Sequence, residues 1–464
     1  MRRWAASRMG GLTVVNLPTR LNLLMMPADE RSGADLAVSD GTSLGRAAFL
    51  GAAFFVVIAS HYIFKAVHGG LVVSRLTAFG VPKIDLLDTM TSFLVCIILY
   101  LGRSLRQRLS NLSLPVLLAG VSFLGLFPTF YARWTGPATP PLVLLSVVGS
   151  SLCSLGVYLA WVLFTSTTTA ARWNTIALFG AGAQAAVIAG TSAAHAWMER
   201  FSALTLLYVS AGGYLLASLL FYHALRRFTC FSVKDESQAA GGRPREMTSA
   251  GHSPVLSGFF LSMAGLIAAQ IAFRQSLQWR IFSHAGQVAS TAETVGISLA
   301  IFYRWQGILS LLAQCLVVPL VFRFVNLRVA IYLQPSFGIL AIACAALAPD
   351  ASFLVGLIAL YSSLDYTVNN CVRESFFITH STATKIFAKS WLALLLPKVG
   401  SMIGSATLLM VNVFGLASWY VWGAIFSVGG LLAARCLAAL QRGDRNRQWV
   451  LQESVDEAAS QVAH

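Results

Sequence analysis

The chain has 464 residues, of which 56% are hydrophobic and 11% are charged, and its formal net charge is +15. Soluble domains carry about 25% charged residues, so this composition argues against a soluble protein. Most of the basic residues lie in segments between apolar stretches, on one side of a membrane if both termini are cytoplasmic. That asymmetry follows the positive-inside rule and explains the charge without a nucleic-acid-binding surface.

About twelve apolar stretches are each long enough to cross a bilayer as a helix, for which about 20 residues suffice. They cover residues 46–66, 84–102, 113–131, 141–165, 174–196, 202–224, 254–273, 294–321, 329–348, 351–372, 387–411 and 418–438. The outer side then receives Arg75, Lys83, Arg133, Arg200, Arg274 and Arg280. We therefore expect an all-α integral membrane protein of the cell inner (cytoplasmic) membrane, multi-pass, with both termini cytoplasmic.

Three long polar segments flank and divide the apolar stretches, and the middle one, residues 226–253, separates them into two groups of six. Residues 1–45 form a polar N-terminal tail, for which a cleaved transit peptide is an alternative, and residues 441–464 form a polar C-terminal tail. Residues 226–253 are rich in Gly, Ser, Pro and charge, which is typical of a flexible cytoplasmic linker. The layout of two six-helix halves, 46–225 and 254–440, predicts the major-facilitator architecture, in which solute binds between the halves.

The first span carries basic residues on one face. His61, Lys65 and His68 are spaced i, i+4 and i+7, and we expect Lys65 to bind solute and the two histidines to relay protons. Asp88 in the second span is a candidate partner of Lys65 or a proton carrier. The alternative is that these histidines are packed or interfacial. In the eighth span, Gln314 is expected to bond solute or a neighbouring helix.

The tenth span ends in the polar segment YSSLDYTVNNCVRESFF, residues 361–377. One helical stripe holds Asp365, Asn369 and Arg373, and the neighbouring stripe holds Tyr366, Asn370 and Glu374. Charge at bilayer depth is costly and normally faces a partner or a water-filled cavity. We expect the two asparagines and the arginine to bind solute and the two acids to serve coupling. The alternative is that the Arg–Glu pair is an ordinary boundary charge at the cytoplasmic mouth.

Lys398 in the eleventh span lies between Pro397 and the small residues Gly400 and Gly404. A cation so far from either end of an apolar span suggests binding of an anionic solute, and a buried ion pair with an acid of the tenth span is the alternative. The seven cysteines have no metal-ligand spacing, and no catalytic motif of the common hydrolase or nucleotide-binding kinds is present. We therefore predict a protein that is not an enzyme and that needs no cofactor or metal.

Four stretches resemble one known family, the nucleotide transporters (ATP:ADP exchangers) of plastids and intracellular bacteria, which belong to the major facilitator superfamily. They are SLDYTVNNCVRESFF, IFAKSWLALLLPKVGSMIGS, FYRWQGILSLLAQCLVVPLVFRFVNLRVA and VYLAWVLFTSTTTAARWNTIALFGAGAQAAVIAG. The resemblance implies that Arg373 and Glu374 match the family's basic–Glu pair, and Lys398 its lysine in the eleventh helix. The first span, KAVHGG, lacks the acid usual there, so the chain resembles a divergent member or relative.

These features predict a secondary active transporter that moves a small anionic solute across the lipid bilayer by alternating access. The resemblance implies a nucleotide or other phosphorylated metabolite as solute, and protons or a counter-substrate as the coupled species. One alternative is a proton-coupled importer or exporter of a siderophore, peptide or antibiotic-like molecule. Another is a non-transporting receptor or assembly factor. No partner protein is indicated.

Overall fold

The structure is a computed structural model that describes residues 41–76, 87, 90–95, 97, 113–167, 173–227, 258–288, 291–325, 327–347, 351–373, 392, 396–414 and 420–440. Helical residues occur in each of the twelve expected spans. Within the described residues, eight helices are long and apolar enough to cross a membrane, by length and composition. The prediction of an all-α membrane protein is therefore confirmed.

The N-terminal group of helices surrounds one long helix, α3 (Gly41–Leu76), which extends beyond both ends of the first expected span. The helices that follow it are α5 (Ser113–Ser122), η2 (Phe123–Leu126), α6 (Phe127–Arg133), α7 (Thr139–Leu144), η3 (Leu145–Gly149), α8 (Ser150–Thr167), α9 (Trp173–Met198) and α10 (Ala203–Arg227). Helix α3 packs against α8, α9 and α10, and its apolar side chains form much of the buried core.

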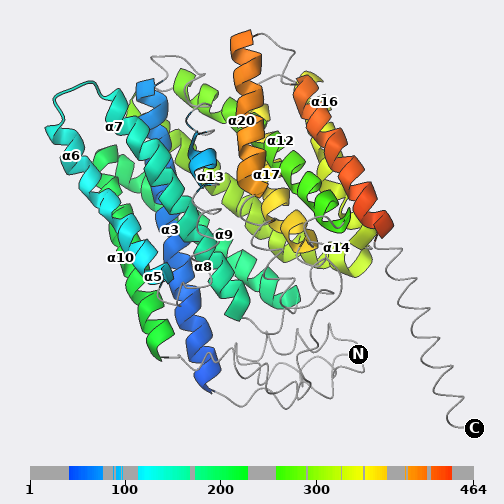
Figure 1. The fold of residues 1–464 in the computed structure, drawn as a ribbon, viewed down its shortest axis with the longest axis horizontal. Helices are drawn as coiled ribbons and strands as arrows, with labels where there is room; N and C mark the ends of the chain where they lie inside the picture. Colours follow the sequence, from blue (N-terminus) through cyan, green and yellow to red (C-terminus); the bar gives the residue numbers. More distant parts are fainter. Residues whose placement is uncertain are drawn as a thin grey trace, which may run out of the picture.

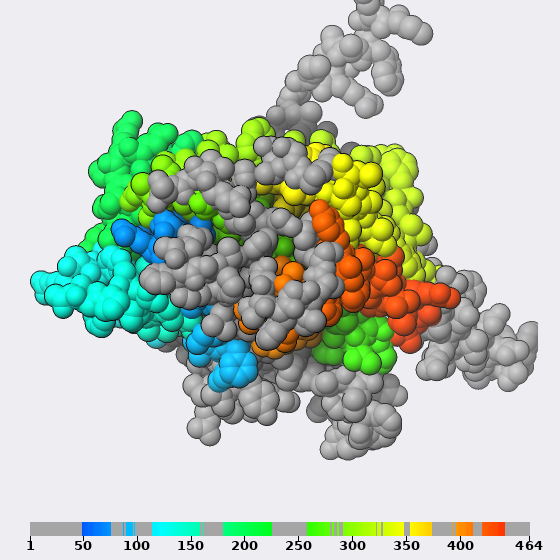
Figure 2. Space-filling view, turned by 90° about the horizontal axis from the view of Figure 1, so that it is seen from above, coloured from blue at the N-terminus to red at the C-terminus, as the bar shows by residue number. Residues whose placement is uncertain are grey.

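The C-terminal group is arranged beside the first (Figures 1 and 2), with its yellow-to-red helices on the right of both views. It contains α12 (Gly258–Val288), α13 (Ala292–Leu312), η5 (Ala313–Val317), α14 (Val318–Phe324), α15 (Leu327–Ala330), α16 (Leu333–Leu347), α17 (Ala351–Leu364), η6 (Asp365–Asn369), α20 (Leu396–Phe414) and a last helix, Tyr420–Leu440. The helix of α17 and η6 continues to Arg373.

The two groups meet where α13 packs along α3 and α9. Glycines allow this close approach: a Cβ atom on Gly296 would lie 2.6 Å from Met198 Sδ, and one on Gly70 would lie 3.0 Å from the Gly296 backbone. Small residues are typical of helix contacts in membranes. Arg304 Nη1 of α13 also lies 3.3 Å from His195 Nδ1 of α9, so this arginine contacts the other group of helices.

In the part of the chain that the structure describes, π-helical segments of five residues interrupt three of the expected spans. These are η3 in the fourth span, η5 in the eighth and η6 in the tenth. A π-helical segment replaces the i→i+4 hydrogen bonds of an α-helix by i→i+5 bonds, and such segments often mark functional sites. Each of the three contains at least one residue of the cavity described next.

Candidate functional site

A cavity of about 520 Å³ lies between the two groups of helices and is lined by residues of both. Cavities of about 300–1,000 Å³ typically hold small-molecule ligands. The structure brings together at this cavity most of the residues singled out from the sequence, namely His61, Lys65, His68, Gln314, Asp365, Asn370, Arg373 and Lys398. Asp88 and Glu374 lie outside the described residues, as do most of the linker and both polar tails.

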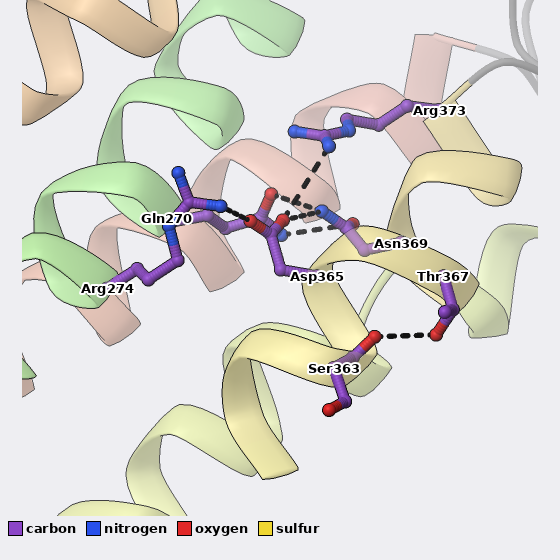
Figure 3. A network of polar contacts seen from close by, with 7 residues as sticks. All are labelled: Gln270, Arg274, Ser363, Asp365, Thr367, Asn369 and Arg373. Carbon is purple, nitrogen blue, oxygen red and sulfur yellow. Dashed lines mark hydrogen bonds and ion pairs between the residues drawn. The ribbon is translucent and has the colours of Figure 1, made fainter. Parts of the chain in front are cut away.

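The most deeply buried charge in the cavity wall is Asp365, whose residue is 1% exposed. Its Oδ2 atom lies 2.6 Å from Arg274 Nη1, and its Oδ1 atom lies 3.6 Å from Arg373 Nη2. Figure 3 shows the two guanidinium groups approaching the carboxylate from different sides. A buried carboxylate needs such partners because removing it from water is costly. Two cations therefore share one acid, and the group carries a net positive charge.

Asn369 lies behind this ion pair, one turn after Asp365. Its Nδ2 atom donates to Asp365 Oδ1 at 3.0 Å and to Gln270 Oε1 at 2.8 Å, while its Oδ1 atom accepts from Gln270 Nε2 at 3.2 Å. Both amides are buried. The expected stripe of Asp365, Asn369 and Arg373 thus exists, although a π-helical segment begins it. Asn370, on the neighbouring stripe, lines the cavity.

Arg274 is the site residue that sequence reasoning missed. The seventh span was expected to end at residue 273 and to leave Arg274 outside the membrane, and this expectation is wrong. Helix α12 continues to Val288, and the Arg274 side chain is only 17% exposed. Its guanidinium carbon lies 4.8 Å from the centroid of the Tyr366 ring. Because Asp365 and this ring compensate the charge, the cation can remain within the span.

Lys398 reaches the same cavity from α20. Helix α20 packs closely on α12, since a Cβ atom on Gly400 would lie 2.8 Å from the Ala268 carbonyl oxygen and one on Gly404 would lie 2.7 Å from that of Ala272. The small residues after the lysine therefore set the distance between the two helices. The ion pairs of Asp365 in the structure are made with the two arginines.

The basic face of α3 forms the opposite wall. Lys65 Nζ lies 4.3 Å from the Tyr303 ring centroid and 5.4 Å from that of Tyr62, so aromatic rings stabilise its charge. His61 Nδ1 lies 3.3 Å from the Tyr214 hydroxyl, and His68 Nε2 lies 2.9 Å from Ser146 Oγ. All three basic residues line the cavity, as their spacing on one helical face suggests.

Gln314 belongs to η5 and reaches the cavity from the eighth span. Its Nε2 atom lies 3.5 Å from Cys371 Sγ in the tenth span, so the amide contacts a neighbouring helix. A Cβ atom on Gly180 of α9 would lie 2.9 Å from the Gln314 side chain. The glycine of the fifth span therefore makes room for this amide.

No protein-family model matches the chain, and no curated protein sequence matches it. Solved structures do. The crystal structure of the nucleoside transporter NupG is similar with a TM-score of 0.52 and 13% sequence identity, covering 84% of this chain and 98% of that chain. A mutant of NupG gives a TM-score of 0.53 and 14% identity, covering 84% of this chain and 99% of that chain.

Identity this low establishes the fold alone. The arrangement of helices in this chain is similar to that in the NupG structures, and its cavity lies between the two groups of helices. The chain is accordingly a multi-pass membrane protein with a fold similar to that of NupG.

Proposed function

We propose that this protein is a secondary active transporter that moves a small anionic solute across the membrane by alternating access. The observation that carries the proposal is the charge of the cavity between the two groups of helices. Among the described residues that line it, Lys65, Arg274, Arg373 and Lys398 are cationic, and Asp365 is the acid. Charge at membrane depth is costly, and the net positive charge of these lining residues would attract an anionic solute.

The unequal contacts of Asp365 suggest how binding is coupled to movement. Arg274 is held at 2.6 Å, whereas Arg373 is 3.6 Å away. An anion entering the cavity would take Arg373 from the carboxylate more readily than Arg274. The empty carrier would then re-form the longer contact. Asp365 would thus compete with the solute for the cations, and Glu374 would do the same if it faces the same cavity. Alternatively, these carboxylates would take up a proton when the solute binds the cations.

The solute that we favour is a nucleotide or other phosphorylated metabolite. This choice rests on the resemblance of several spans to the ATP:ADP exchangers and on a positively charged cavity of about 520 Å³. A second candidate is proton-coupled movement of an uncharged nucleoside, which the likeness in fold to a nucleoside transporter favours. We further propose the cell inner membrane as the location, with both termini cytoplasmic, from the distribution of basic residues.

Counterflow in proteoliposomes tests the proposal. Vesicles containing purified protein are loaded with ADP, buffer or adenosine, and uptake of labelled ATP, AMP and adenosine is followed with and without a proton gradient. Acceleration of nucleotide uptake by internal nucleotide supports anion exchange. If adenosine alone moves, and only with a proton gradient, the second candidate is correct. If none of the three moves under any condition, both are wrong. Arg373→Gln is the site variant, and Arg323→Gln, an exposed arginine at the end of α14, is its matched control.

A further inference from the structure

The two groups of helices contain matching polar junctions at the cavity. With six expected spans in each group, the first span corresponds to the seventh and the fourth to the tenth. In the C-terminal group, Arg274 of the seventh span bonds Asp365 at the start of π-helical η6 in the tenth. In the N-terminal group, His68 of the first span bonds Ser146 in π-helical η3 of the fourth. All four residues line the cavity.

The likeness extends to the aromatic neighbours of the two bases. Arg274 lies over the Tyr366 ring at 4.8 Å. The His68 ring is stacked on Phe64, with centroids 5.3 Å apart and an interplanar angle of 11°. Stacking of this kind fixes the plane of a polar group and directs its hydrogen-bonding edge. Each junction therefore consists of an arginine or histidine side chain that contacts an aromatic ring and is bonded to a polar side chain of a π-helical segment.

The junctions differ in charge. Ser146 replaces a carboxylate by a hydroxyl, and an imidazole is largely neutral at neutral pH. Thr91 Oγ1 of the second span donates to the Ser146 carbonyl oxygen at 3.2 Å, which supports the backbone of η3 with another neutral group. Ser150 follows one turn later and also lines the cavity. Serine hydroxyls and neutral imidazoles can both donate and accept hydrogen bonds, so the pair of His68 and Ser146 suits hydroxyl or carbonyl groups. The cation of this wall is Lys65, whose Nζ atom lies over the Tyr303 ring of the C-terminal group at 4.3 Å.

We propose that His68 and Ser146 form a second, uncharged subsite, which hydrogen-bonds a hydroxyl or carbonyl group of the same solute whose anionic group contacts Arg373 and its neighbours. This inference rests on the proposed function and narrows it: the solute has an anionic end and a neutral polar end, and the neutral end contacts His68 and Ser146 of the N-terminal group of helices. A single solute molecule would then contact both walls of the cavity, and its binding would be coupled to the rocking of one group of helices against the other.

Binding measurements on the purified protein test the subsite with probes that contain one end or both. The probes are AMP, adenosine and inorganic phosphate, and affinity is measured by isothermal titration. His68→Leu removes the hydrogen bond between the imidazole and the solute. Ser146→Ala removes the hydrogen bond of the serine hydroxyl with a smaller change in side-chain volume. Loss of one hydrogen bond to a ligand weakens binding by about tenfold. We expect that loss for AMP and adenosine, with phosphate affinity unchanged within about twofold.

Two further variants separate hydrogen bonding from other roles. His68→Gln keeps a hydrogen-bonding side chain without an ionisable group, and we expect it to bind AMP within about threefold of wild type. His223→Leu makes the same change as His68→Leu at an exposed position of α10 and should change nothing. Variants are compared only when they elute as the wild type does on size exclusion.

Three results would overturn the inference. The first is unchanged AMP affinity in both His68→Leu and Ser146→Ala. The second is an equal loss for phosphate. The third is a His68→Gln variant as weak as His68→Leu. If wild-type protein binds AMP or phosphate in the same experiments, these three results leave the proposed function unaffected. Wild-type protein that binds none of the probes would refute the proposed function and this inference together.

Discussion

Removing either partner of the ion pair between Arg274 and Asp365 should destabilise the protein by several kcal/mol, and separate and joint replacement of the two residues would measure their coupling energy. Their side chains are 17% and 2% exposed, and the joining atoms are 2.6 Å apart. Removing one partner of a buried ion pair costs about 3–5 kcal/mol, because the remaining charge is left unpaired. Arg373 still lies 3.6 Å from the carboxylate, so Arg274→Met should fall near or below the lower limit, at about 2–3 kcal/mol.

Asp365→Leu should cost more, because two guanidinium groups then lose their shared acid. We expect about 3–4 kcal/mol for it. The double variant Arg274→Met, Asp365→Leu removes both charges of the short pair and leaves Arg373 beside the cavity. Apolar replacement of a whole buried pair is often neutral or stabilising. Its cost should therefore fall short of the sum of the single costs by about 2 kcal/mol or more.

Unfolding of the detergent-purified protein by titration with a denaturing detergent supplies these free energies. Arg323→Met is the matched control, since that arginine is exposed at the end of α14, and it should change stability by less than about 0.5 kcal/mol. Single costs that simply add in the double variant would show that the pair has no coupling energy. The placement of Arg274 inside the seventh span would then be wrong.

Two further predictions concern packing and binding. Gly404→Val should destabilise the protein by about 1–3 kcal/mol or prevent its folding, because a Cβ atom there would lie 2.7 Å from the Ala272 carbonyl oxygen. Gly429→Val is the control: no atom lies within 4 Å of a Cβ atom at that position, so the thermal midpoint of unfolding should shift little. Lys65→Met should raise the AMP concentration for half-maximal uptake by about tenfold. Lys65→Arg should restore most of the wild-type affinity, because an arginine keeps the charge over the Tyr303 ring. Equal uptake by Lys65→Met and wild type would show that this lysine is not part of the binding site.

Much of the tenth span could be predicted from local spacing alone. Residues four apart on a helix share a face, so Asp365, Asn369 and Arg373 could be grouped before any tertiary contact was known. The spacing could not separate a residue that faces the cavity from one that supports its neighbour. Asn369 bonds Gln270 and Asp365, and only the contact with α12 shows that its amide is occupied in this way.

Arg274 shows the opposite limit. An arginine after an apolar stretch of about 20 residues marks the end of a span by hydropathy. The residues that follow it, QSLQWRIFSHAGQV, are polar enough to look like a loop. Helix α12 nevertheless includes them. The burial of Arg274 depends on Asp365 and Tyr366, about ninety positions later, which compensate its charge. A partner so distant in sequence leaves no periodic signal near the arginine itself.

The sequence by itself determined that the chain is a helical membrane protein and predicted about twelve spans, because about 20 consecutive apolar residues have one stable arrangement in a bilayer. It also located the rare polar residues inside those spans, because each of them is costly there. The tertiary structure alone decided which of those residues meet. Asp365 pairs with Arg274 and Arg373, and His68 pairs with Ser146, because helix packing sets distances between spans that no single span encodes.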